Sequence, residues 1–142
     1  MKDLILNILS IIILLAGLIV NIIFRDQFNG EIFFRIIGML ITITGVIIWI
    51  IARITLGKYF TMSTIPKGLI TNGIYSKLRH PMYYGGILIY IGGGLFFRSI
   101  VGLIFTVILI LPMLIYFAIE EDKLLRLKFK EKYSNYKLKT IL

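Results

Sequence analysis

The chain alternates between long, uncharged apolar stretches and shorter polar connections. Four apolar stretches stand out, at residues 4–24, 36–52, 82–97 and 99–119. Crossing the hydrocarbon core of a bilayer, about 30 Å thick, takes roughly 20 helical residues. The second stretch reaches this length if Arg35 extends to the interface, and the third if its helix begins at Pro81. Because backbone in lipid must satisfy its own hydrogen bonds, the pattern predicts an all-α integral membrane protein with about four transmembrane helices.

Composition excludes several other classes of protein. Of 142 residues, 58% are hydrophobic and 16% charged, and the mean hydropathy is +0.94. A disordered chain would be far less hydrophobic, and a soluble domain of this length could not bury so much apolar surface. With no cysteine and one histidine, no metal site is expected. The length predicts a single domain, residues 1–142.

The basic residues are unevenly divided between the two sides of the predicted bundle. With four crossings, the amino terminus, residues 53–80 and the carboxyl tail share one side. That side holds all 16 lysines and arginines except Arg25, Arg35 and Arg98. Because basic residues favour the cytoplasmic side, we expect both termini and residues 53–80 to be cytoplasmic. The richness in isoleucine and lysine favours a prokaryotic plasma membrane. The net charge of +9 is explained by this asymmetry, because basic loops on the cytoplasmic side contact the anionic headgroups of the lipid bilayer. No nucleic-acid partner is therefore expected.

Two polar segments are candidates for function. Residues 53–80 form a long connection without an acidic residue, with turn signals at Pro66-Lys67-Gly68 and Asn72-Gly73. Long connections in compact domains are often functional. Residues 120–139 have the pattern of an amphipathic helix, which would lie along the membrane surface or fold back on residues 53–80.

Opposite charges are expected to meet at one membrane edge. Arg79-His80-Pro81 precedes the third apolar stretch, where the free N–H groups of a helix start attract anions. Glu120-Glu121-Asp122 ends the fourth stretch, where carboxylates oppose the helix dipole. A short turn around Arg98 makes these two helices antiparallel, so the two clusters should converge. Lys123 and Arg126 could neutralise the acids; alternatively, the acids hold a cation. S-adenosylmethionine, with a carboxylate, an ammonium and a sulfonium, would fit both halves.

Glycines recur at seven-residue spacing in the third stretch. Gly85 and Gly92 form one row, and Gly86 and Gly93 form another. Small residues in a row let a second helix or a flat ligand approach the backbone closely. Packing between helices is the favoured interpretation, and the same row permits a homodimer.

Several motifs occur in an order that resembles a known superfamily. They are Ala52-Arg53-Ile54-Thr55-Leu56-Gly57-Lys58, then Gly68-Leu69-Ile70-Thr71-Asn72-Gly73-Ile74-Tyr75, then Arg79-His80-Pro81-Met82-Tyr83-Tyr84-Gly85, and Glu120-Glu121 followed by Leu124, Phe129, Tyr133 and Tyr136. Over residues 52–138 the chain resembles the integral-membrane isoprenylcysteine carboxyl methyltransferase and phospholipid methyltransferase superfamily. The first two apolar stretches resemble it only in being apolar.

The resemblance implies a membrane methyltransferase that uses S-adenosylmethionine and takes a lipophilic small-molecule or lipid substrate from the bilayer. Residues 1–52 would form two N-terminal spans and residues 53–142 the cofactor-binding part. The implied cofactor contacts are Tyr75, Arg79, His80, Tyr83, Glu120 and Glu121, and the implied catalytic residues are Arg79, Glu120 and Glu121.

The chain departs from the superfamily pattern at three points. Ile74 replaces a proline and Lys130 replaces a glycine. Counting back from Phe129 and Tyr133 aligns the acidic pair with Glu121-Asp122 instead of Glu120-Glu121, so two registers remain open.

Three functions are compatible with these features. The first is methyl transfer from S-adenosylmethionine to a carboxylate or amine of a prenylated or lipid acceptor. The second is an NADPH-dependent membrane reductase of the sterol-reductase type, which carries a related string. In that string an asparagine and a glutamate stand where this chain has Met82 and Gly86. The third is a non-enzymatic small membrane subunit. The two replacements favour the methyltransferase.

Overall fold

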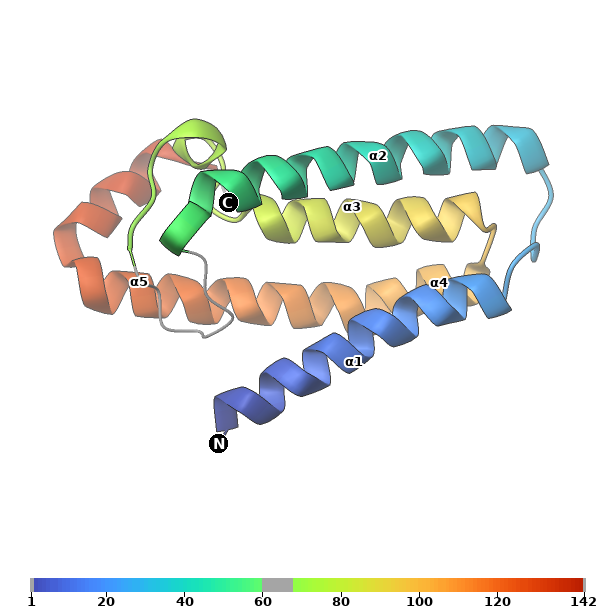
Figure 1. Ribbon diagram of the computed structural model, residues 1–142, viewed down its shortest axis with the longest axis horizontal. Helices are drawn as coiled ribbons and strands as arrows, with labels where there is room; N and C mark the ends of the chain where they lie inside the picture. Colours follow the sequence, from blue (N-terminus) through green and yellow to red (C-terminus); the bar gives the residue numbers. More distant parts are fainter. Residues whose placement is uncertain (1, 60–67, 142) are drawn as a thin grey trace.

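The protein is a helical bundle, described for residues 2–59 and 68–141 by a computed structural model. Its helices are α1 (Lys2–Ile23), α2 (Glu31–Leu56), α3 (Pro81–Phe96), α4 (Ile100–Phe105) and α5 (Leu111–Lys139). Shorter helical turns are η1 (Gly57–Tyr59), η2 (Gly73–Ser76) and η3 (Thr106–Ile110). In Figure 1, α3 lies between α2 and the row formed by α4 and α5, and α1 packs against α4.

The predicted all-α membrane class is confirmed. All four apolar stretches are helical. Among the described residues, three segments are long and apolar enough to cross a membrane: Ile5–Ile23, Glu31–Leu56 and a part of Ile100–Lys139. The apolar part of the last segment ends at Ile119. The third stretch, α3, begins at Pro81 as expected, but it has only 16 residues, which span about 24 Å. The expectation that a start at Pro81 would give it the full spanning length is therefore wrong.

The second span is longer than its apolar stretch. It begins at Glu31, after Gly30 with a φ of 94°, and ends at Leu56, before Gly57 with a φ of 50°. Positive φ angles are accessible to glycine at little cost, so Gly30 allows the chain to turn into the helix and Gly57 allows it to turn out of it. The helix therefore includes residues on both sides of the apolar stretch 36–52, and Arg35 lies within it, as expected for a segment of spanning length. The predicted turn at Pro66-Lys67-Gly68 lies mostly outside the described residues.

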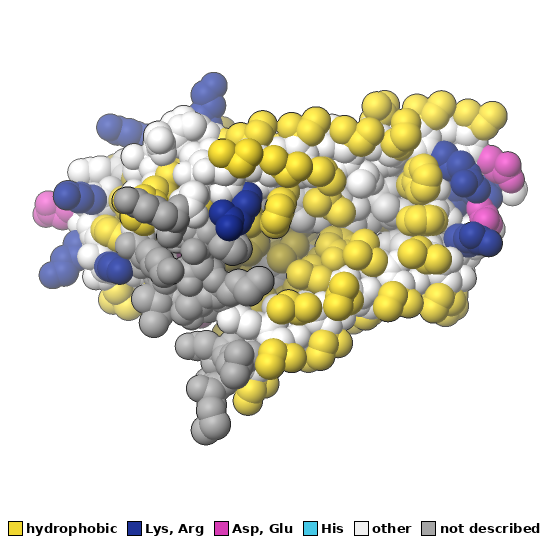
Figure 2. All heavy atoms as spheres, in the orientation of Figure 1, with side chains coloured by type: hydrophobic (Ala, Val, Ile, Leu, Met, Phe, Trp, Pro, Cys, Tyr) yellow, Lys and Arg dark blue, Asp and Glu magenta, His cyan; other side chains and the backbone are white. Residues whose placement is uncertain are grey.

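Apolar side chains cover the middle of the surface. Figure 2 shows hydrophobic side chains around the middle of the visible face and charged side chains gathered towards the two ends. Isoleucines of α1 and α2 remain exposed, for example Ile19 at 54% and Ile47 at 51%. Such a continuous apolar band is a liability in water, whereas lipid tails solvate it. The band therefore fits an integral membrane protein.

The first glycine row of α3 packs against α2. A Cβ on Gly85 would lie 2.8 Å from the carbonyl oxygen of Gly45, and a Cβ on Gly92 would lie 2.7 Å from that of Gly38. The two backbones are therefore in direct contact, which small residues permit. The packing interpretation of Gly85 and Gly92 is confirmed.

A polar clamp at one end of the bundle fixes the reversal between α3 and α4. Arg98, with a φ of 53°, donates from Nη1 to the carbonyl oxygen of Phe28 at 2.8 Å and pairs with Asp26. The backbone N–H of Asp26 donates to the carbonyl oxygen of Phe97 at 2.9 Å. The predicted short turn around Arg98 is present, and it makes α3 antiparallel to the α4–α5 row.

The fourth apolar stretch contains a change of helical geometry. Residues Thr106–Ile110 form a π-helical turn, and the Leu111 N–H donates to the carbonyl oxygen of Thr106, five residues back. Pro112 lacks the N–H of a regular helix and would clash with the preceding turn. A π-turn is one of the usual ways in which a helix accommodates such an interruption.

Helix α5 continues beyond its apolar part, and the chain then reverses its direction. The reversal is at Lys130, with a φ of 44° and a ψ of −117°. The residues after it, 131–141, form the C-terminal arm. Tyr133 and Tyr136 of the arm pack with Leu125 and Leu69. Residues 120–139 were expected either to lie along the membrane surface or to fold back on residues 53–80. The structure has the second arrangement: the fourth span continues as a helix to residue 130, and the arm then folds back.

Candidate functional site

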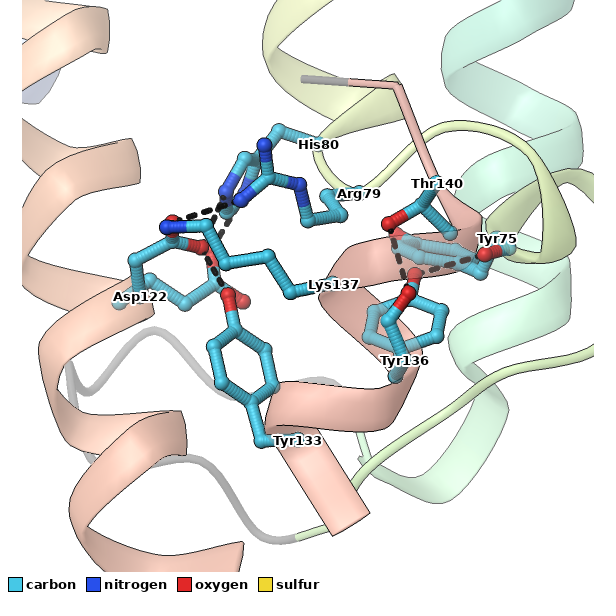
Figure 3. A network of polar contacts seen from close by, with 9 residues as sticks. Tyr75, Arg79, His80, Asp122, Tyr133, Tyr136, Lys137 and Thr140 are labelled. Carbon is cyan, nitrogen blue, oxygen red and sulfur yellow. Dashed lines mark hydrogen bonds and ion pairs between the residues drawn. The ribbon is translucent and has the colours of Figure 1, made fainter. Parts of the chain in front are cut away.

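The start of α3 and the polar part of α5 meet at one end of the bundle. Arg79 Nη1 lies 3.1 Å from Asp122 Oδ2, and His80 Nε2 lies 2.8 Å from Asp122 Oδ1. Figure 3 shows Arg79 and His80 pointing from the α3 side towards Asp122 on α5. The Arg79 and His80 side chains are only 7% and 10% exposed. The predicted convergence of the cationic and acidic clusters is present in the structure.

Asp122 is the centre of this network. Its Oδ1 also accepts a hydrogen bond from the Tyr133 hydroxyl, and its Oδ2 lies 3.7 Å from Lys137 Nζ. Burial by itself raises the pKa of this carboxyl, but hydrogen bonds from His80 and Tyr133 and the charge of Arg79 lower it to about 2. Asp122 is therefore a carboxylate at neutral pH, with both oxygens engaged.

His80 is held in its charged form. Burial by itself lowers the pKa of the imidazole, but contacts with Asp122 and Glu121 raise it to about 9. Both ring nitrogens then carry a proton and are able to donate. Nε2 donates to Asp122, whereas Nδ1 lies 3.5 Å from Glu121 Oε2, which is an ion-pair contact rather than a short hydrogen bond.

Glu121 borders the network and stays accessible. Its side chain is 36% exposed, and it lies against the Tyr83 side chain as well as against His80. The ring of Tyr83 is 5.7 Å from that of His80. Unlike Asp122, Glu121 still has acceptor capacity for a further cation.

Tyr75 lies beside the same cluster. It belongs to η2, which begins at Gly73 with a φ of 56°, so the Asn72-Gly73 turn forms as predicted. Tyr75 is 7% exposed, and its carbonyl oxygen accepts from the Tyr136 hydroxyl at 2.6 Å. Burial, together with the charge of Glu121, raises the pKa of the Tyr75 phenol. Isoleucine at position 74 has not prevented the turn.

Glu120 lies apart from these contacts. Its Oε1 is 2.6 Å from Lys123 Nζ. For this acid, the expectation that Lys123 neutralises the charge therefore applies. The structure thus brings Arg79 and His80 together with Glu121 and Asp122, which is the second of the two registers. The catalytic role assigned to Glu120 stays a prediction, without a contact to the network among those described.

The sequence did not identify Tyr133 and Lys137 as parts of the site. Both fit the pattern of an amphipathic helix, and they reach Asp122 only because the chain reverses at Lys130. One signal was present: the superfamily pattern has glycine where this chain has Lys130. Glycine is the residue that adopts a positive φ readily, so this position marked a reversal.

We expect Lys130→Gly to stabilise the protein by about 1 kcal/mol, because an L-residue with a left-handed φ is strained. Thermal or detergent-induced unfolding measures the change. The control is Lys132→Gly, two residues further on in regular helix, which should destabilise by about the same amount. Equal effects of the two substitutions would show that Lys130 is unstrained.

The family comparison agrees with this geometry. The chain matches the phospholipid methyltransferase family over residues 32–132. The match includes nearly all of α2, of which the sequence motifs covered only the last residues, 52–56, and it includes both the cationic and the acidic residues of the network. No curated protein matches the chain significantly. Because the match covers most of the chain and all four of the residues Arg79, His80, Glu121 and Asp122, the protein belongs to the phospholipid methyltransferase family of membrane proteins.

Proposed function

We propose that this protein transfers a methyl group from S-adenosylmethionine to a lipophilic acceptor in the bilayer. The observation that carries the proposal is the placement of two buried cations, Arg79 and His80, on Asp122, with the accessible carboxylate of Glu121 beside His80. The amino-acid end of S-adenosylmethionine has a carboxylate and an ammonium, so a site that binds it needs both signs of charge at short range.

The residues present fit this group. Arg79 Nε and His80 Nδ1 are buried and make no hydrogen bond within the described part of the chain. Buried donors without partners are costly, and the carboxylate of the cofactor would satisfy both. Glu121, which keeps acceptor capacity, would receive the ammonium. Tyr75 and Tyr83 flank Glu121 and would line the cofactor wall.

S-adenosylmethionine supplies an electrophilic methyl group on its sulfonium. The chain's own contribution would be to orient the reactants, which is worth on the order of 7–11 kcal/mol at best, and to limit water. A carboxylate acceptor needs no general base, and Arg79 would help to bind it. An amine acceptor must lose a proton, and Glu121 is the candidate base. The two engaged oxygens of Asp122 suit it less for this role.

The apolar band around the bundle supports an acceptor that arrives through the membrane. The network lies at the start of α3 and just after the apolar part of α5, where the exposed apolar surface gives way to charged side chains. An acceptor with a hydrophobic tail and a polar head would place its head at this boundary between apolar and charged surface. From the distribution of basic residues, this end would face the cytoplasm.

The proposal is tested by calorimetric titration of the purified protein in detergent with S-adenosylmethionine. We expect the parent to bind and Glu121→Gln to bind at least about tenfold more weakly, because one charge-assisted contact is lost. Glu131→Gln, an exposed acid elsewhere on α5, is the matched control and should bind like the parent.

A parallel titration with NADPH distinguishes the reductase alternative. The proposal requires heat from S-adenosylmethionine and none from NADPH. Binding of NADPH alone would overturn it, and so would a Glu121→Gln variant that binds S-adenosylmethionine as tightly as the parent.

A further inference from the structure

The C-terminal arm is attached to the segment that carries the buried cations. The Arg79 N–H donates to the carbonyl oxygen of Ile141 at 3.2 Å, and the Ile141 N–H donates to that of Lys77 at 2.8 Å. The Tyr136 hydroxyl adds its bond to the Tyr75 carbonyl oxygen. Through these bonds the reversed end of the chain is held against residues 75–79, next to Asp122 on the straight part of α5.

From this position the arm contacts both oxygens of Asp122. Tyr133 is 1% exposed, and its hydroxyl donates to Oδ1, the oxygen that also accepts from His80 Nε2. Lys137 Nζ approaches Oδ2, which faces Arg79. In Figure 3, Tyr133 approaches Asp122 from below, Arg79 and His80 approach it from above, and Lys137 reaches it between them.

We infer that Tyr133 is a positioning residue for the cofactor site: its hydroxyl holds the Asp122 carboxylate in the orientation that pairs with His80 and Arg79. A carboxylate can rotate about its last side-chain bond, and each oxygen here has a cationic neighbour. Without the hydroxyl, the one partner left to Oδ1 within residues 2–59 and 68–141 would be His80, while Oδ2 would still have Arg79 and Lys137. Rotation towards these two cations would then loosen His80, the donor proposed for the cofactor carboxylate.

This inference rests on the proposed function for its role, but its geometric part can be measured without cofactor. The chain has one histidine, so nuclear magnetic resonance of ¹⁵N-histidine-labelled protein in detergent follows the titration of His80 alone. Besides Asp122, the titratable groups facing this ring are Glu121 and Tyr83. Neither is changed by the test substitution.

The test compares Tyr133→Phe with Tyr116→Phe. The first keeps the buried ring and removes only the hydroxyl; the second removes a hydroxyl from an exposed tyrosine of the same helix. In Tyr133→Phe the pKa of His80 should fall towards its ordinary value, and in Tyr116→Phe it should not move. In an Asp122→Asn background, Tyr133→Phe should add no further change.

A binding measurement separates this inference from the proposed function. We expect Tyr133→Phe to weaken S-adenosylmethionine binding about tenfold in calorimetric titration, as for the loss of one hydrogen bond to a charged group. An unchanged or raised His80 pKa in Tyr133→Phe overturns the inference and leaves the methyltransferase proposal intact. A lowered pKa in a protein that binds no S-adenosylmethionine supports the positioning of Asp122 and overturns the cofactor assignment.

Discussion

Asp122→Asn is expected to cost about 3 kcal/mol of unfolding free energy, the low end for breaking a buried ion pair. The substitution keeps the size of the side chain but removes the charge that balances Arg79 and His80, whose side chains are 7% and 10% exposed. Because these cations would also bind the methyl donor, affinity for S-adenosylmethionine should fall by about two orders of magnitude. Unfolding in mixed detergent micelles and calorimetric titration measure the two effects.

The control for this substitution is Glu131→Gln, which removes an exposed charge from the same helix. It should change the unfolding free energy by no more than a few tenths of a kcal/mol. If Asp122→Asn were as stable as Glu131→Gln and bound the cofactor equally well, Asp122 would not be the centre of the network.

Unfolding free energy should fall as the pH rises from about 6.5 to about 9. The pKa of His80 is raised from 6.5 to about 9 in the folded protein, so the folded state keeps a proton that the unfolded state releases. The stabilisation is fully present below pH 6.5 and is lost as the pH rises through 9. Its size is on the order of 3 kcal/mol.

His80→Gln is the control for this pH dependence, because the chain then contains no histidine. Its unfolding free energy should be lower than that of the parent at pH 6 and should vary little between pH 6 and 9. A parent protein whose stability is constant over this range would contradict the pairing of His80 with Asp122.

The pattern of hydrophobic residues was sufficient to predict the helices that a lipid environment requires. The four helical stretches, the start of α3 at Pro81 and the reversal at Arg98 follow from spacing, proline chemistry and short connections. Once α3 and the fourth span are antiparallel, the meeting of Arg79-His80 with the acidic cluster is a topological consequence. The charged site was therefore predictable at the level of segments.

The identity of the contacting acid was not predictable, because it depends on helical phase. The π-turn at Thr106–Ile110 inserts about one residue into the fourth span, and each added residue rotates the rest of the helix by roughly 100°. This change alters which of Glu120, Glu121 and Asp122 faces α3. No hydrophobic pattern marks it, since the stretch around it is apolar on all sides.

The reversal of α5 at Lys130 could not be predicted from the sequence pattern, for a different reason. Lysine is an ordinary helical residue, so residues 120–139 have the pattern of one continuous helix. The strained φ at Lys130 exists because tertiary contacts, the packing of Tyr133 and Tyr136 against Leu125 and Leu69, compensate for its cost. Local propensity carries no information about such contacts. For this reason the sequence marked Tyr133 as a motif residue without indicating its contact with Asp122.

The central claim is that the charged end of this bundle places a methyl donor where a lipid can receive its methyl group. The most direct measurement uses the protein reconstituted in vesicles with a total lipid extract and deuteriomethyl-labelled S-adenosylmethionine, followed by mass spectrometry of the lipids. The account predicts a deuteriomethyl increment on a lipid carboxylate or amine, which is lost in Asp122→Asn and kept in Glu131→Gln. A lipid fraction without label, from a parent protein shown to be folded, would contradict it.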